Sequence, residues 1–256
     1  MVATTYVSPA LGASRFYVWM AAACAAVAIG GFVPTYWSQL PAGTFVGQPL
    51  IHVHAVVFTA WPLLFLSQTW LAAHNRLEHH RAWGMAGISL ATALFVVGMV
   101  TAIQSAELRV VKGGDDRGLA FLIIPMSAIS LFAGFFAAAV ANLARPNVHK
   151  RLMVLATIAL LQPALVRVFF ILKTGGGPGL RPGMNGPPPM ATTIGPALVA
   201  ELFVVAAILY DWRTRGRPHP VYLIGLATMV LVHFGRLPLS GTPQWKAIAS
   251  ALTTLV

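Results

Sequence analysis

The stretch LAFLIIPMSAISLFAGFFAAAVA (119–141) decides the fold class, because it carries no charged side chain over a length that can cross a bilayer. A helix needs about 20 predominantly apolar residues to span the hydrocarbon core. Six further apolar segments of similar length flank this one, at 16–36, 50–72, 83–104, 151–172, 191–210 and 220–237. The sequence therefore predicts an all-α protein: a polytopic transmembrane helical bundle of about seven spanning helices, with residues 1–256 forming a single transmembrane domain.

The composition excludes a soluble globule and argues against a nucleic-acid partner. Hydrophobic residues make up 57% of the chain and charged residues only 9%, whereas soluble domains carry about 25% charged residues. The formal net charge is +11, but no basic stretch is interleaved with aromatic residues to form a stacking platform. Basic residues gather in the cytoplasmic loops of membrane proteins. The predicted partner is therefore the lipid bilayer.

The distribution of Lys and Arg predicts the orientation. Nine basic residues lie at the N-terminus and on the same side as it: Arg15, Arg76, Arg81, Arg145, Lys150, Arg151, Arg213, Arg215 and Arg217. Seven lie on the opposite side: Arg109, Lys112, Arg117, Lys173, Arg181, Arg236 and Lys246. The positive-inside rule then favours a multi-pass protein of the bacterial inner (cytoplasmic) membrane with a cytoplasmic N-terminus. The Gly/Pro-rich stretch 173–190 is expected to be an irregular outer loop.

Of the charged residues in the predicted spans, Arg167 and Glu201 lie clearly inside them and are the first candidates for a functional site. Arg167 lies near the outer end of the fifth segment, and Glu201 lies in the outer half of the sixth. Ionisable groups inside a membrane are rare and usually paired, so we expect an ion pair between them. Such a pair fits two roles: fixing the packing of two helices, or keeping a buried carboxylate that accepts a proton or binds a metal.

Three histidines share the predicted outer layer with Glu201. His52 and His54 open the second segment, and His233 lies near the outer end of the seventh. Imidazole and carboxylate are common ligands of zinc, iron and copper, so His52, His54, His233 and Glu201 form a candidate site for a transition metal or haem b. The spacing of His52 and His54 turns them about 200° apart on a regular helix. Interfacial histidines that bond to backbone or water are the alternative.

A polar and aromatic stripe runs along the second segment. His54, Trp61 and Gln68 recur every seven residues and so share one helical face. This stripe is expected to face the bundle interior, where it lines a cavity, flanks a porphyrin or quinone, or serves ordinary packing. With Arg167 placed to neutralise a haem propionate, these four residues are the predicted cofactor-binding residues.

A second set of histidines lies on the predicted inner side. His80, His149 and His219 sit at or just before helix starts, where the helix dipole disfavours a protonated imidazole. Neutral imidazole is the form that binds a metal or haem iron, so these residues are a second candidate metal site. Helix capping at the positive-inside boundary explains them equally.

Several motifs carry a resemblance to a known group of proteins. They are HAVVFTAWPLLFLSQ (54–68), EHHRAWG (78–84), RPNVHKRLMVLATIALL (145–161) and RTRGRPHP (213–220). On the HKRLM and GRxHP motifs the chain resembles an uncharacterised family of bacterial polytopic membrane proteins. More remotely, it is similar to predicted membrane proteins with a cytochrome b561-like arrangement. The resemblance implies the helical fold and no settled activity.

These observations leave three functional hypotheses. The first is a redox or electron-transfer protein that holds haem or a transition metal and exchanges electrons with a quinone or a membrane redox partner. The second is a proton-coupled transporter or binder of a small molecule, and the third is a non-catalytic assembly or scaffold subunit. The chain has no HExxH, dinucleotide glycine fingerprint or nucleophile elbow, so catalytic residues are not assigned.

Overall fold

The protein is an α-helical bundle in the computed structural model, which describes residues 11–111, 116–180, 182–183 and 186–255. Seven stretches are long and apolar enough to cross a membrane. They are Arg15–Trp37, Pro49–Ala73, Leu77–Arg109, Arg117–Ala141, Pro146–Thr174, Met190–Arg215 and Pro220–Ser240. The predicted fold class is therefore confirmed. Arg181 and Lys112, which entered the orientation count, lie outside the described residues.

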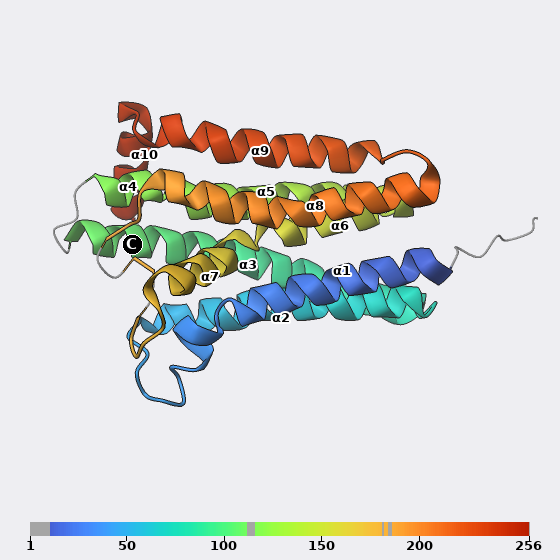
Figure 1. The fold of residues 1–256 in the computed structure, drawn as a ribbon, viewed down its shortest axis with the longest axis horizontal. Helices are drawn as coiled ribbons and strands as arrows, with labels where there is room; N and C mark the ends of the chain where they lie inside the picture. The colour runs from blue at the N-terminus through green and yellow to red at the C-terminus, as the bar shows by residue number, and fades with distance from the viewer. Residues whose placement is uncertain (1–10, 112–115, 181, 184–185, 256) are drawn as a thin grey trace, which may run out of the picture.

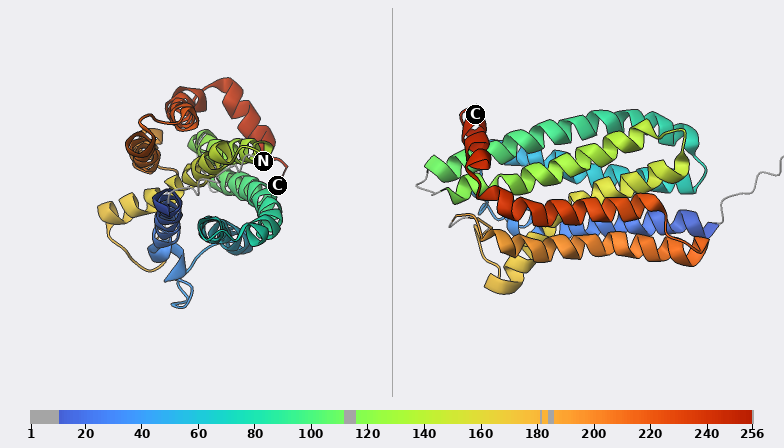
Figure 2. Two further views of the ribbon diagram at one scale, coloured as in Figure 1. Left: turned by 90° about the vertical axis from the view of Figure 1, so that its right-hand side faces the viewer. Right: turned by 90° about the horizontal axis from the view of Figure 1, so that it is seen from above.

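The helices run along the long axis of the molecule, and consecutive spans are antiparallel (Figure 1). They are α1 Leu11–Gly30 with the π-helical turn η1 Val33–Trp37, α2 Pro49–Ala73, α3 Leu77–Val111, α4 Arg117–Phe121, α5 Ile123–Ala141, α6 Pro146–Ala159, α7 Gln162–Thr174, the 3-10 turn η2 Met190–Thr193, α8 Ile194–Arg215, α9 Pro220–Ser240 and α10 Pro243–Thr253. α10 lies across one end of the bundle (Figure 2). We call this end, which the orientation count predicts to be the outer one, the α10 end.

Several spans extend beyond the segments predicted from apolar runs. The third begins at Leu77 rather than at 83, the sixth continues to Arg215, and the seventh continues to Ser240. The added residues include polar ones, and a search for apolar runs ends a segment where such residues begin. As a result, Asp211 belongs to a spanning helix rather than to a loop, and Arg236 lies inside α9 rather than at its end.

The fifth span is broken into α6 and α7 at Leu160 and Leu161. Pro163 is the second residue of α7, and proline cannot donate the backbone hydrogen bond that would join the two helices. Figure 2 shows α7 turned away from the direction of α6. Next to the break, Gln162 Nε2 donates a hydrogen bond of 2.9 Å to the Thr193 carbonyl oxygen. This hydrogen bond attaches the start of α7 to the start of the sixth span.

α6 lies at the centre of the bundle and packs against α1, α5, α8 and α9. Its residues Val154, Leu155 and Ile158 have no exposed surface and belong to the largest apolar core. A Cβ atom on Gly225 of α9 would stand 2.3 Å from Leu155 Cδ1. The close approach of α9 to α6 therefore depends on this glycine, and it fixes the position of the polar residues of α9.

Candidate functional site

Three ionisable side chains lie buried together between α8 and α9, towards the α10 end. Glu201 is 3% exposed, and His233 and Arg236 are each 2% exposed. His233 Nδ1 stands 3.0 Å from Glu201 Oε1. We call these three residues the outer cluster. It is the part of the predicted metal-ligand set that the fold brings together, with Arg236 added.

The helical register of α8 and α9 positions the outer cluster. His233 and Arg236 are three residues apart on α9 and so lie on the same face. Glu201 is in the second turn of α8, which packs against α9. With a rise of 1.5 Å per residue, Glu201 lies about 10 Å from the start of α8, and His233 lies at a similar depth from the end of α9. The cluster therefore sits within the spanning part of the bundle.

Arg236 links the outer cluster to α5 and keeps donor capacity. Its Nη1 donates a 3.2 Å hydrogen bond to Ser127 Oγ, and its charge interacts with that of Glu201. Arg236 Nε and Nη2, like His233 Nε2, are buried and have no hydrogen-bond partner among the described residues. A buried polar group without a partner costs about 1–3 kcal/mol. A ligand that supplies hydrogen-bond acceptors to these nitrogen atoms would remove that cost and bind more tightly.

The predicted ion pair between Arg167 and Glu201 is replaced by a different arrangement. Among the described residues, the side chain that contacts Glu201 is that of His233, at 3.0 Å between Nδ1 and Oε1. Arg167 lies with its guanidinium carbon 3.9 Å from the centre of the Phe32 ring and donates to the Pro163 carbonyl oxygen. The physical reason is the break before α7, which directs the Arg167 face of that helix to the residues that follow α1.

The four predicted metal ligands divide into two groups. His52 Nδ1 lies 2.8 Å from the Tyr36 hydroxyl, and His54 stacks on Phe58 at 3.9 Å between ring centres. Their helix α2 packs against α1 and α3, whereas α9 packs against α5, α6 and α8. Within the described part of the chain, no group of three or more His, Cys, Asp or Glu side chains could hold a metal ion. The outer cluster therefore does not fit a metal ion by itself.

The stripe on α2 faces the interior at two of its three positions. Trp61 is 2% exposed and Gln68 is 8% exposed, whereas His54 is half-buried. Trp61 Nε1 donates a 3.2 Å hydrogen bond to Thr157 Oγ1 on α6, so this tryptophan ties α2 to the central helix.

The histidines of the second candidate set bond to nearby backbone groups. His80 Nδ1 lies 3.3 Å from the Gln68 carbonyl oxygen, and His149 Nδ1 lies 2.9 Å from that of Ala139. His219 Nδ1 accepts a hydrogen bond from the Val221 amide and caps α9. Burial, and then the charges of Arg151 and Arg215, lower the pKa of His219. This agrees with the neutral imidazole predicted for that position.

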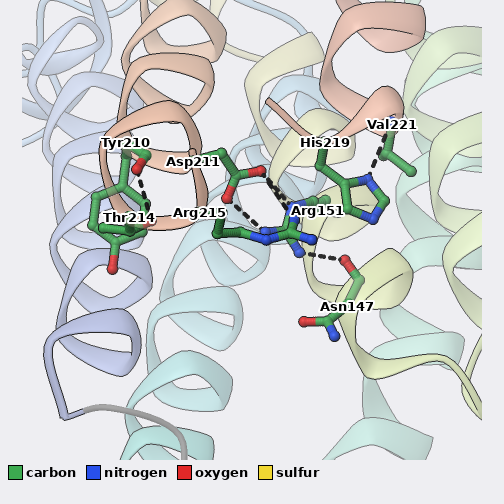
Figure 3. Close-up of polar contacts among 8 residues, drawn as sticks. All are labelled: Asn147, Arg151, Tyr210, Asp211, Thr214, Arg215, His219 and Val221. Atoms are coloured by element: carbon green, nitrogen blue, oxygen red, sulfur yellow. Dashed lines mark hydrogen bonds and ion pairs between the residues drawn. The ribbon is translucent and has the colours of Figure 1, made fainter. Parts of the chain in front are cut away.

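A buried ion pair joins α6 and α8 (Figure 3). It lies at the end of the bundle opposite α10 (Figure 1). Arg151 Nε donates to Asp211 Oδ2 at 2.8 Å and Arg151 Nη2 donates to Asp211 Oδ1 at 2.5 Å. The two side chains are 2% and 1% exposed. Arg215 Nη1 adds a contact of 3.7 Å to Asp211, and Arg151 Nη1 donates to the Asn147 carbonyl oxygen. This pair is well satisfied by hydrogen bonds, as expected of a structural pair.

Sequence reasoning missed three of these residues. Arg151 counted as a loop-edge charge, Asp211 fell just beyond the predicted segment 191–210, and Arg236 counted as a charge near the C-terminus. A signal was present for Asp211: it is the one acidic residue beside the basic run 213–217. A carboxylate in that position indicates a specific cationic partner.

Comparisons with protein-family models, with curated proteins and with solved structures find no match for this chain. The resemblance to bacterial polytopic membrane proteins therefore stays a prediction from the motifs, and function has to be argued from the outer cluster.

Proposed function

We propose that this integral membrane protein binds a small anion together with a proton at the outer cluster, as a proton-coupled binder or transporter. The observation that carries the proposal is the buried contact of 3.0 Å between His233 and Glu201 beside Arg236. Arg236 retains two buried nitrogen atoms without a partner among the described residues. A guanidinium with free donors is a suitable group for recognising a carboxylate, sulfonate or phosphate.

The coupling to a proton follows from charge balance. With Glu201 ionised and His233 neutral, the charges of Glu201 and Arg236 cancel. An incoming anion adds one negative charge, and an uncompensated charge inside the membrane is costly. One proton taken up by the cluster restores neutrality, so the anion and the proton bind as a pair.

Two adjacent groups can carry that proton. A proton that binds the His233 imidazole forms an imidazolium beside the Glu201 carboxylate. The proton can instead reside on Glu201, whose Oε1 lies 3.0 Å from His233 Nδ1 without forming a hydrogen bond to it. The imidazole and the carboxyl group are then both neutral. In either location the cluster gains one positive charge relative to its resting state. Glu201 and His233 therefore act as the proton site and Arg236 as the anion site.

The test uses purified protein in lipid nanodiscs with butanesulfonate, a sulfonate that does not itself take up a proton. In the wild type, the dissociation constant is expected to rise about tenfold for each pH unit, because one proton is bound with each anion. Glu201→Gln leaves Arg236 uncompensated, so binding should persist and become independent of pH. Arg236→Gln should lose at least tenfold in affinity.

Glu78→Gln is the matched control. Glu78 is exposed at the start of α3, so this substitution removes one negative charge away from the outer cluster. It should behave as the wild type does. Failure of the wild-type protein to bind butanesulfonate, or an unchanged pH dependence in Glu201→Gln, would contradict the proposal.

The haem or transition-metal hypothesis has one supporting observation, at His54. Its Nδ1 is buried and has no hydrogen-bond partner in the described part of the chain, and Arg167 interacts with it electrostatically. A single imidazole beside a cation suits an axial ligand next to a propionate. A haem absorption band in the purified protein that disappears in His54→Ala would support this function, and a band that persists there would exclude His54 as the ligand.

A further inference from the structure

A groove between α5 and α9 opens beside the outer cluster. It has a volume of about 440 Å³ and is lined by Ser127, Ser130, Leu131, Gly134, Phe135, Thr228 and Val232. Ser130 and Gly134 are exposed, and Thr228 and Val232 are half-buried. We call this feature the α5–α9 groove. It lies on the outer surface of a bundle whose spans are apolar enough for lipid, so it is reached sideways from the bilayer.

The shape of the groove follows from the spacing of its residues. Ser127, Leu131 and Gly134 recur every three or four residues on α5, and Thr228 and Val232 are four apart on α9, with Arg236 four further on. Each set shares one helical face. From Ser127 to Gly134 the groove follows α5 for about 10 Å along the bundle axis.

Arg236 is buried behind one end of this groove, in contact with a residue of its lining. Its Nη1 bonds to Ser127 Oγ, and Ser127 lines the groove. The other two guanidinium nitrogen atoms are buried without a partner among the residues that the structure describes. An apolar groove next to a buried arginine with unpaired nitrogen atoms is complementary to a molecule with an acidic head and a hydrocarbon chain.

We propose that the anion bound at the outer cluster is a single-chain amphiphilic acid, whose head group meets Arg236 and whose chain lies in the α5–α9 groove. This inference rests on the proposed function and names its ligand class. The volume is that of a site for one small molecule, at the lower end of the 300–1,000 Å³ typical of ligand pockets. Phospholipids with two chains are correspondingly disfavoured.

Photo-crosslinking of dodecanoic acid with a mid-chain diazirine tests the inference in nanodiscs, with peptide mapping by mass spectrometry. Labelling is expected on α5 between Ser130 and Phe135 and on α9 between Thr228 and Val232. Arg236→Gln should reduce it at least fivefold. Gly134→Leu should do the same by filling the groove, because a Cβ atom at Gly134 meets no atom within 4 Å and the fold accepts it.

Two controls isolate the head group and the groove. The methyl ester of the same probe has no charge and should label the groove at least fivefold less. Gly84→Leu places the same side chain at another helical glycine with open space around it, and should label like the wild type. Uniform labelling of all lipid-facing helices, equal labelling by the ester, or unchanged labelling in both Arg236→Gln and Gly134→Leu would overturn the inference.

The outcome separates this inference from the proposed function. If the groove is labelled but the wild type binds butanesulfonate independently of pH, the inference about the ligand class is supported and the proposed proton coupling is contradicted. If butanesulfonate binds together with a proton but the groove is not labelled, the proposed function is supported and the inference that the ligand is an amphiphilic acid is contradicted.

Discussion

At the scale of single residues, the buried arginines Arg151 and Arg236 differ in their degree of hydrogen bonding. Arg151 and Asp211 share two short hydrogen bonds, whereas Arg236 beside Glu201 keeps nitrogen atoms without a partner among the described residues. Removing one partner of such a pair is destabilising, because it leaves an uncompensated charge buried. A buried arginine with unpaired nitrogen atoms inside a membrane-spanning bundle is a candidate ligand site.

We expect Asp211→Asn to lower the free energy of unfolding by about 3–5 kcal/mol, because it leaves the buried Arg151 without its counter-charge. Thermal unfolding of the purified protein in detergent measures the change. Asp116→Asn is the control, since Asp116 is 69% exposed in its pair with Lys246 and such surface pairs contribute about 0–1 kcal/mol. Equal effects of the two variants would show that the buried pair is not structural.

His219 gives the protein a pH-dependent stability. Its pKa is lowered in the folded protein, so the unfolded chain takes up the proton first as the pH falls. The contribution is present above the unfolded pKa of about 6.5 and is lost as the pH falls from there through the folded pKa. Protonation also removes the Nδ1 acceptor that caps α9. The melting temperature should therefore fall below about pH 6.5, and this fall should be smaller in His219→Ala than in the control His74→Ala, where the histidine is exposed.

At the scale of helices, the spans could be predicted from sequence but their rotations could not. The run 119–141 marks a span whatever its neighbours are, because the bilayer requires an apolar helix. Which residue meets Glu201 depends on how α7, α8 and α9 are rotated about their axes. The break at Leu160 and Leu161 changed that rotation for α7, so Arg167 faces Phe32 and His233 takes the place beside Glu201.

The contact between the end of α1 and α7 provides a test of the broken fifth span. A Cβ atom on Gly31 would lie 2.6 Å from the Ala164 carbonyl oxygen, whereas one on Gly30 would meet nothing within 4 Å. Because a backbone atom cannot move as a side chain does, Gly31→Ala should destabilise the protein by about 1–3 kcal/mol, and Gly30→Ala should leave the melting temperature nearly unchanged. Similar melting temperatures for both variants would contradict the position of α7.

At the scale of the whole molecule, the count of basic residues predicts how the two ends of the bundle face. The positive-inside rule predicts that the α10 end faces away from the cytoplasm. Cysteine labelling in intact bacterial cells with a membrane-impermeant maleimide tests this prediction. Lys173→Cys should be labelled and Glu78→Cys should not, while Cys24, which has no exposed surface, should leave the wild type unlabelled. The reverse pattern would invert the orientation.

The central claim, that a neutral buried cluster takes up an anion only with a proton, is tested most directly by counting protons. Weakly buffered nanodiscs with a pH-sensitive dye report the protons removed from solution while saturating butanesulfonate is added. Charge balance within the outer cluster predicts about one proton per bound anion in the wild type and none in Glu201→Gln. Anion binding by the wild type without proton uptake would contradict it.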